Sequence, residues 1–253
     1  MFNLAGKRAI VIGGTSGIGC AIALGLASAG ADVVASSRSQ EAVDVLAHEI
    51  EAMGRTTLRI TSDVLSKGSL QKLHDSVISA FGRVDILVNS AGITKRTPTL
   101  ECTEEEWNGI MDVNLKGTLY ACQIFGKSMI ERQYGRIVNI ASLSTFIAFQ
   151  EVAAYGASKA AVGALTRSLA VEWAQSGVTV NAIAPGIIPT ELNREILESA
   201  RGHELLLRTP MQRFGTPKEI VGAAIYLASD ASSFTTGQIV TVDGGYMASG
   251  VNQ

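Results

Sequence analysis

The sequence predicts an α/β fold in which helices cover both faces of a parallel sheet. Short β-branched segments alternate with longer segments whose apolar residues recur at helical spacing, a pattern typical of repeated strand–helix–strand units. The strand segments are apolar almost continuously, as strands covered on both faces should be. The predicted strands are RAIVIG (8–13), ADVVAS (31–36), TTLRIT (56–61), VDILVN (84–89), GRIVNI (135–140), VTVNAI (178–183) and QIVTV (238–242).

Composition indicates one large domain. The chain has 253 residues, of which 47% are apolar and 17% charged, so it can bury a large core. No Pro/Ser-rich linker or charge run divides it, and we expect residues 1–253 to form a single domain. The formal net charge is -2 and the basic residues are scattered, which argues against a nucleic-acid partner. No apolar run reaches about 18 residues and no signal peptide is evident, so we expect a cytoplasmic protein without a membrane partner.

The sequence gives no indication of a metal site or a disulfide framework. Its three cysteines and three histidines are widely separated, with neither Cys-x-x-Cys nor His-x-x-x-His spacing. A Gly-x-Ser-x-Gly elbow is also missing, which argues against a serine hydrolase.

A glycine-rich turn, GGTSGIG (13–19), follows the first predicted strand and leads into an apolar helix. Its glycines permit a tight turn, a close approach of backbone amides to a pyrophosphate, and close packing of helix on strand. In the first strand–helix unit, such a turn predicts a dinucleotide site. The residues expected to bind the dinucleotide here are Gly13, Thr15, Ser16, Gly17, Ile18 and Gly19.

The end of the second predicted strand indicates which dinucleotide is bound. An NAD site tends to place a carboxylate there for the ribose 2′-hydroxyl, whereas an NADP site needs a cation for the 2′-phosphate. In VVASSRSQ (33–40), Ser37 offers a hydroxyl and Arg38 a guanidinium, and the first acid is Glu41. NADP(H) is therefore preferred, with NAD(H) as the alternative. In the competing interpretation, Arg38 is a solvated residue at the start of the next helix.

Further candidates follow the later strands. Asp63, beside Val64, is suited to accept a hydrogen bond from an adenine amino group, although an aspartate here also suits a helix cap. The small residues of NSAG (89–92) allow the chain to run close beside a ribose. Ser142 follows the fifth predicted strand, thirteen residues before Tyr155.

Tyr155 and Lys159 are one helical turn apart in a segment of small residues, so both side chains lie on one helix face. A free tyrosine titrates near 10, about three units too high for a base at neutral pH, and a nearby cation lowers that pKa. The pair therefore suits acid/base chemistry. Its alternative is an ordinary, partly solvated helix edge.

Together these segments resemble the short-chain dehydrogenase/reductase family from about Gly6 to Gly245. The shared pieces occur in order: Gly-x-x-x-Gly-x-Gly at 13–19, the turn at 89–92, Asn114 in DVNLKG, Ser142, Tyr-x-x-x-Lys at 155–159, APG at 184–186 and VDGG at 242–245. The resemblance implies a single Rossmann-type domain, a seven-stranded parallel sheet and a homotetramer. Ile12 and Ser90 depart from the family's usual Thr and Asn, so a bond between the two cofactor loops is expected to be missing.

The resemblance also implies residue roles. Tyr155 is the acid/base, Lys159 lowers its pKa and holds the ribose hydroxyls, Ser142 bonds the substrate oxygen, and Asn114 holds a water that links Lys159 to solvent. A segment at about 190–210 is expected to cover the substrate. The remaining cofactor contacts implied are Asn89, Ala91, Gly92, Pro185, Gly186, Ile188 and Thr190.

The reaction predicted is hydride transfer between NADP(H) and a secondary alcohol or ketone. AGITKRTP, TELN and VDGGYMAS resemble gluconate 5-dehydrogenases and related sugar-acid dehydrogenases, and a small-molecule sugar acid or polyol is the expected substrate. Arg96 is then a candidate partner for the carboxylate, or else a surface arginine. One alternative is a 3-oxoacyl-carrier-protein reductase, which needs a basic docking patch. Another is a non-catalytic NADP(H)-binding sensor or scaffold.

Overall fold

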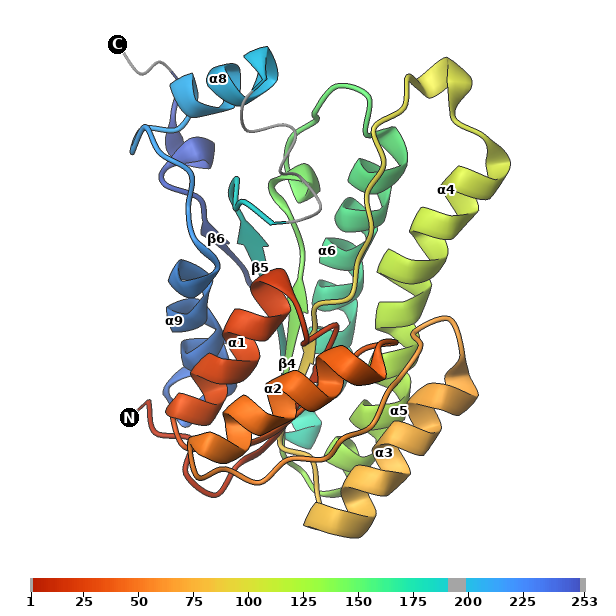
Figure 1. Cartoon of the computed structure of the whole chain (residues 1–253), viewed down its shortest axis with the longest axis vertical. Helices are drawn as coiled ribbons and strands as arrows, with labels where there is room; N and C mark the ends of the chain where they lie inside the picture. The colour runs from red at the N-terminus through yellow and green to blue at the C-terminus, as the bar shows by residue number, and fades with distance from the viewer. Residues whose placement is uncertain (1, 191–198, 251–253) are drawn as a thin grey trace.

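The computed structural model describes residues 2–190 and 199–250. Within them, a parallel sheet of six strands lies between two layers of helices, in the order β2-β1-β3-β4-β5-β6 (Figure 1). The α/β prediction, with helices on both faces of a parallel sheet, is thus confirmed. The strands are β1 (Arg8–Ile12), β2 (Asp32–Ser36), β3 (Ile86–Asn89), β4 (Gly135–Ile140), β5 (Val178–Pro185) and β6 (Ile239–Val242).

The prediction of seven strands is wrong, because the segment 56–61 does not join the sheet as a strand. It runs beside β2, where the N–H of Val33 donates to the carbonyl of Thr56 (3.2 Å), but side chains bond two of its other backbone groups. The backbone N–H of Thr56 donates to the carboxylate of Asp32 (2.7 Å), and the carbonyl of Ile60 accepts from the Ser36 hydroxyl (2.7 Å). The described part of the sheet therefore ends at β2.

Helices from different parts of the chain cover the two faces of the sheet. One face carries α1 (Gly17–Ser28), α2 (Gln40–Ala52) and α9 (Pro217–Ala228), and the other carries α3 (Lys67–Phe81), α5 (Gly117–Glu131) and α6 (Ala153–Trp173). None of the described helices has the length and apolar character needed to cross a bilayer. The remaining helical elements are η1 (Thr99–Glu101), α4 (Glu104–Met111), η2 (Asp112–Lys116), η3 (Leu143–Thr145), η4 (Ala174–Ser176), α8 (Ala200–Leu207), η5 (Asp230–Ser232) and η6 (Tyr246–Ala248).

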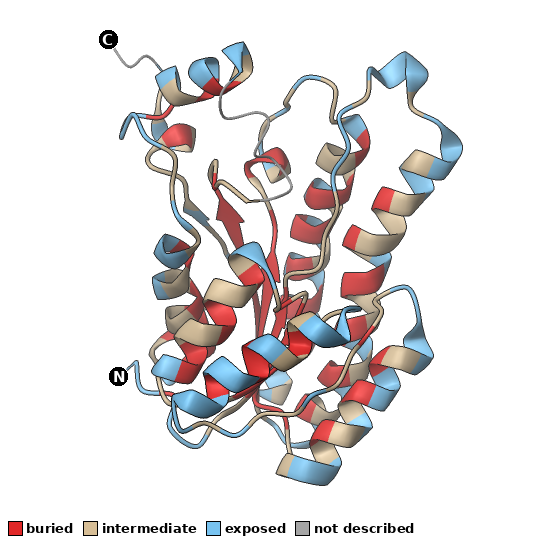
Figure 2. Cartoon of the chain, in the orientation of Figure 1, coloured by how far each residue is buried: buried red, intermediate tan, exposed pale blue. Residues whose placement is uncertain are grey.

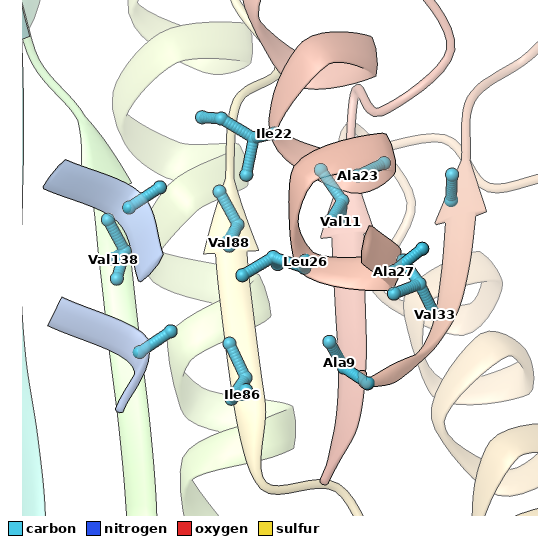
Figure 3. Packing of buried hydrophobic residues seen from close by; sticks show 14 of the residues in the cluster. Ala9, Val11, Ile22, Ala23, Leu26, Ala27, Val33, Ile86, Val88 and Val138 are labelled. Atoms are coloured by element: carbon cyan, nitrogen blue, oxygen red, sulfur yellow. The ribbon is translucent and has the colours of Figure 1, made fainter. Parts of the chain in front are cut away.

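The packing of α1 on the sheet shows how the first strand–helix unit is held. Ile22 and Leu26 of α1 lie over Val88 and Val11 of the strands, and the small side chain of Ala23 lets the helix approach closely (Figure 3). Strands β3, β4 and β5 are buried throughout and β1 and β2 after their first residue, whereas the edge strand β6 is only partly buried and the outer sides of α2 and α3 are exposed (Figure 2). Each fully buried Leu or Ile contributes about 1.5–3 kcal/mol. This packing fixes the turn between β1 and α1 at the carboxyl edge of the sheet.

The order of the strands places a crevice at that edge. The chain runs from β1 outward to β2 and then returns to β3 on the other side of β1. Ligands of open parallel sheets bind beyond the carboxyl ends of the strands at such a switch point. In Figure 1, α8 lies beyond the carboxyl end of β5.

Candidate active site

A cleft of about 680 Å³ opens beyond the carboxyl ends of the strands, within the size range of small-molecule sites. Its lining is built from the turn after β1, the ends of β2 to β5, the start of α6, and α8. The structure thus brings most of the predicted site residues into one cavity. The predicted residues in its lining are Gly13, Ser16, Gly17, Ile18, Gly19, Ser37, Arg38, Asp63, Val64, Ala91, Gly92, Ser142, Tyr155, Lys159, Pro185, Gly186, Ile188 and Thr190.

The glycine-rich turn owes its shape to close backbone packing. Gly13 has a φ of +74°, and a Cβ on it would lie 2.5 Å from the backbone nitrogen of Ala91. A Cβ on Gly19 would lie 2.1 Å from the carbonyl oxygen of Gly13. Both positions therefore require glycine. The first turn of α1 consequently presents its free backbone amides toward the cleft, where their partial positive charge favours an anion.

The two departures from the family pattern lie where the cofactor loops meet. Ile12 is buried against the core, and both Ile12 and Ser90 are part of the cleft lining. The backbone N–H of Ser90 donates to the carbonyl of Ile12 at 2.9 Å, and the Ser90 hydroxyl oxygen lies 3.0 Å from where a Cβ on Gly19 would be. The loops are therefore joined by backbone contact.

Hydroxyls and a guanidinium gather at the end of β2. The Thr15 hydroxyl, which is not itself in the cleft lining, donates to the Ser37 hydroxyl at 2.8 Å, and the neighbouring Arg38 is exposed to the cleft. Asp63 also lines the cleft, and its carboxylate accepts from the backbone N–H of Leu65 at 3.0 Å. The cap of α3 is Ser66 instead of Asp63, so the helix-cap interpretation of Asp63 is wrong.

Ser142, Tyr155 and Lys159 converge in the cleft. Ser142 begins η3 directly after β4; its hydroxyl oxygen accepts from the backbone N–H of Ser144 at 3.1 Å and is hydrogen-bonded to the Tyr155 phenol. The Lys159 ammonium lies 5.8 Å from the centre of the Tyr155 ring and donates to the carbonyl of Ile140 at 2.7 Å. A phenol, a hydroxyl and a buried cation thus face one cavity.

Burial shifts the pKa values of both titratable groups. It raises the pKa of the Tyr155 phenol, and the hydrogen bond from Ser142 opposes that rise. Burial lowers the pKa of Lys159 to about 8, because its ammonium is removed from water. Lys159 therefore still carries a positive charge at neutral pH, in surroundings where a charge acts strongly on its neighbours.

Asn114 lies behind the cleft, in the π-helical turn η2 that joins α4 to α5. Its side-chain oxygen accepts from the backbone N–H of Ile93 (2.8 Å), while its amide donates to the carbonyl of Ile93 (2.9 Å) and to the Ser158 hydroxyl (2.9 Å). A Cβ on Gly92 would lie 3.3 Å from that side-chain oxygen and 3.5 Å from the Lys159 nitrogen. Asn114 therefore connects the turn after β3 with α6.

Besides Thr15 and Asn114, two predicted residues, Asn89 and Arg96, lie outside the cleft lining. The side-chain amide of Asn89 donates to Asn139 at 2.9 Å within the core, so it faces the interior of the fold. The guanidinium of Arg96 pairs with the Glu151 carboxylate at 2.5 Å. Neither side chain is therefore positioned to contact a ligand bound in this cleft.

Several residues that line the cleft were not predicted from the sequence. Arg201 and Leu205 of α8 face the cleft, as do Ser144, Phe149 and Val152 from the segment between β4 and α6. These positions belong to no short sequence motif. The expectation that residues at about 190–210 cover the substrate pointed only to the region of Arg201 and Leu205. Residues 191–198 of that segment lie outside the described residues.

Comparison with known proteins agrees with this geometry. Residues 13–247 match a family model, adh_short_C2, described as enoyl-(acyl carrier protein) reductase. The chain belongs to the short-chain dehydrogenase/reductase family. As a member of that family, it is an oxidoreductase that acts on alcohols and ketones.

Relatives of this short-chain dehydrogenase/reductase match over nearly their whole length. It is 43% identical to 2-dehydro-3-deoxy-D-gluconate 5-dehydrogenase of Pseudoalteromonas atlantica, over 97% of this chain and 98% of the relative. It is 40% identical to D-threitol dehydrogenase of Mycolicibacterium smegmatis, over 97% and 94%. The crystal structure of a gluconate 5-dehydrogenase from Burkholderia cenocepacia in complex with NADP and tartrate has a TM-score of 0.95 and 38% identity, with 98% of each chain covered.

Proposed function

We propose that this chain is an NADP(H)-dependent oxidoreductase that interconverts a secondary hydroxyl and a ketone on a sugar acid or polyol. The observation that carries the proposal is the convergence of Ser142, Tyr155 and Lys159 in one cleft with the glycine-rich turn. The relatives named for gluconate, deoxygluconate and threitol dehydrogenation support the substrate class.

The cleft fits a dinucleotide because Gly13 and Gly19 let the turn at 13–19 pack tightly against the Ala91 backbone and against itself, which places the start of α1 at the cleft. The amides at the start of α1 would hold the pyrophosphate, and Thr15, Ser37 and Arg38 the 2′-phosphate. Structures of relatives with bound NADP support this choice of cofactor. The residues proposed for the other parts of the cofactor are Asp63 and Val64 for adenine, Ala91 and Gly92 for its ribose, Tyr155 and Lys159 for the second ribose, and Pro185, Gly186, Ile188 and Thr190 for the nicotinamide.

The nicotinamide supplies or accepts the hydride when the cofactor is bound. Tyr155 gives a proton to the ketone oxygen, or takes one from the alcohol, and the Ser142 hydroxyl orients that oxygen. A base at neutral pH requires a phenol pKa about three units lower than usual, which corresponds to about 4 kcal/mol of preferential phenolate stabilisation. The buried Lys159 ammonium contributes to this stabilisation, and Asn114 supports the lysine by holding the turn at Gly92 in place.

The test of the proposed function is turnover with NADP(H) on a panel of sugar acids, polyols and 3-oxoacyl esters. We expect turnover of sugar acids or polyols, and loss of that turnover in Tyr155→Phe. Preference for 3-oxoacyl esters would support the alternative reductase. Binding of NADP(H) without turnover of any member would support the non-catalytic sensor.

We further propose that the subunit is one domain and assembles as a homotetramer in the cytoplasm. Large apolar side chains on the surface support assembly: Val171 of α6 is 82% exposed and Trp107 of α4 is 41% exposed. The three cysteines are unpaired, as is usual in a reducing compartment. Light scattering of the purified protein tests the assembly, and a monomer mass would contradict it.

A further inference from the structure

Three cationic side chains face the cleft within residues 2–190 and 199–250: Arg38, Lys159 and Arg201. Arg38 follows β2, at the edge proposed for the cofactor phosphate. Lys159 is 5% exposed, and its ammonium is bonded to the carbonyl of Ile140. Arg201, in the first turn of α8, is the one that remains for a substrate.

Arg201 belongs to the end of the cleft that holds Ser142 and Tyr155. Its guanidinium donates to the carbonyl of Gln150 at 3.0 Å, in the segment that leads into α6 and Tyr155. Leu205, one helical turn further along α8, packs in a cluster with Leu143, the residue directly after Ser142. The helix is therefore anchored over the groups proposed to bind the reacting oxygen.

The charge of Arg201 has no carboxylate partner within ion-pair distance in the described parts of the chain. A guanidinium carries five N–H donors in a planar fork and matches the two oxygens of a carboxylate. Among the residues that the structure describes, the Arg201 guanidinium makes one hydrogen bond, to the carbonyl of Gln150, so some of its donors are left for a ligand. Arg96, by contrast, is already paired with Glu151.

We propose that Arg201 binds the carboxylate of the substrate and thereby selects sugar acids over neutral polyols. This inference rests on the proposed function and names the residue that recognises the carboxylate of the substrate. The carboxylate bonds the free N–H donors of Arg201, while the reacting carbon lies toward Ser142 and Tyr155. The bond to Gln150 orients the guanidinium from the opposite side.

The test compares two substrates that differ at one carbon: D-gluconate, with a carboxylate at C1, and D-glucitol, with a CH₂OH group there. Steady-state oxidation with NADP is measured for wild type, Arg201→Gln, Arg201→Lys and the control Arg96→Gln. Loss of a charged hydrogen bond is worth about 1.5–3 kcal/mol, so Arg201→Gln should raise KM for D-gluconate about ten- to hundredfold. The KM for D-glucitol should change less than about twofold, and Arg201→Lys should recover part of the loss because it keeps the charge.

The possible outcomes separate this inference from the proposed function. Equal KM changes for both substrates in Arg201→Gln, with wild-type turnover of D-gluconate intact, would show that Arg201 only anchors Gln150, and would overturn this inference alone. A selective loss in Arg96→Gln with none in Arg201→Gln would assign the carboxylate to Arg96. A wild-type enzyme that turns over neither sugar acids nor polyols would contradict the proposed function itself. NADPH binding, followed by its fluorescence, confirms that each variant is folded.

Discussion

The Lys159 ammonium donates a 2.7 Å hydrogen bond to the carbonyl of Ile140, the last residue of β4. This bond holds a cation against the carboxyl end of a central strand, where only 5% of the lysine is exposed. Burial disfavours the charged form and lowers the pKa of Lys159 to about 8. The fold therefore keeps a positive charge next to Tyr155 whose burial lowers the free energy of unfolding. This loss of stability depends on pH and can be measured.

The effect of the buried charge is seen by comparing how the free energy of unfolding changes with pH in wild type and in Lys159→Met. The pKa of Lys159 is about 8 in the folded protein, against the ordinary value of 10.5 in the unfolded chain. Between these values the unfolded chain binds more protons, so the free energy of unfolding of wild type rises with pH. From neutral pH to pH 10.5, wild type should gain up to about 3 kcal/mol relative to Lys159→Met.

Denaturant unfolding at both pH values measures this difference, since it yields the free energy of unfolding of each protein. A difference between wild type and Lys159→Met that stays constant across this range would show that Lys159 titrates normally. The interpretation of Lys159 as a buried cation would then be wrong.

Arg38→Ala tests the choice of cofactor. Removing the guanidinium should weaken NADPH binding about ten- to hundredfold, the range expected for a lost charged hydrogen bond, and leave NADH binding nearly unchanged. Lys72→Ala, which removes an exposed cation from α3, serves as the control and should change neither affinity. Titrations followed by nicotinamide fluorescence give both dissociation constants. If the two affinities fall together in Arg38→Ala, the residue does not contact the 2′-phosphate.

Gly19→Ala and Gly222→Ala separate glycines that the turn requires from one that it does not. A Cβ on Gly19 would lie 2.1 Å from the carbonyl oxygen of Gly13, whereas a Cβ on Gly222, exposed on α9, would have nothing within 4 Å. Gly19→Ala should destabilise the protein and weaken NADPH binding. Gly222→Ala should stabilise it by about 0.5–1 kcal/mol, because alanine favours a helix over glycine. Thermal unfolding of both variants checks this, and similar melting temperatures would contradict the packing described for the turn.

Local patterns sufficed for much of the fold and of the candidate site. Continuous apolar runs mark strands buried on both faces, and residues directly after parallel strands share one sheet edge. Gly13 from the β1–α1 unit and Ser142 and Tyr155 from the β4–α6 unit therefore lie in one cleft as predicted.

The errors come from contacts between distant residues. The segment 56–61 is bonded to β2 partly through the side chains of Asp32 and Ser36 instead of a regular ladder, and no local pattern reveals these bonds to Thr56 and Ile60. From the sequence alone, Arg96 and Arg201 are equally suitable candidates to bind a carboxylate. Only the tertiary structure shows that the first is paired with Glu151 and that the second faces the cleft.

The most direct test of the central claim is the rate of NADPH-dependent ketone reduction by Tyr155→Phe under single-turnover conditions. The substitution removes only the phenol oxygen, so the fold should be retained, and saturating NADPH offsets the loss of the hydrogen bond proposed between Tyr155 and the second ribose. General acid/base catalysis is worth about 10²–10⁴-fold, and the rate should fall by that factor. A rate equal to that of wild type at saturating NADPH would contradict the assignment of Tyr155 as the proton donor.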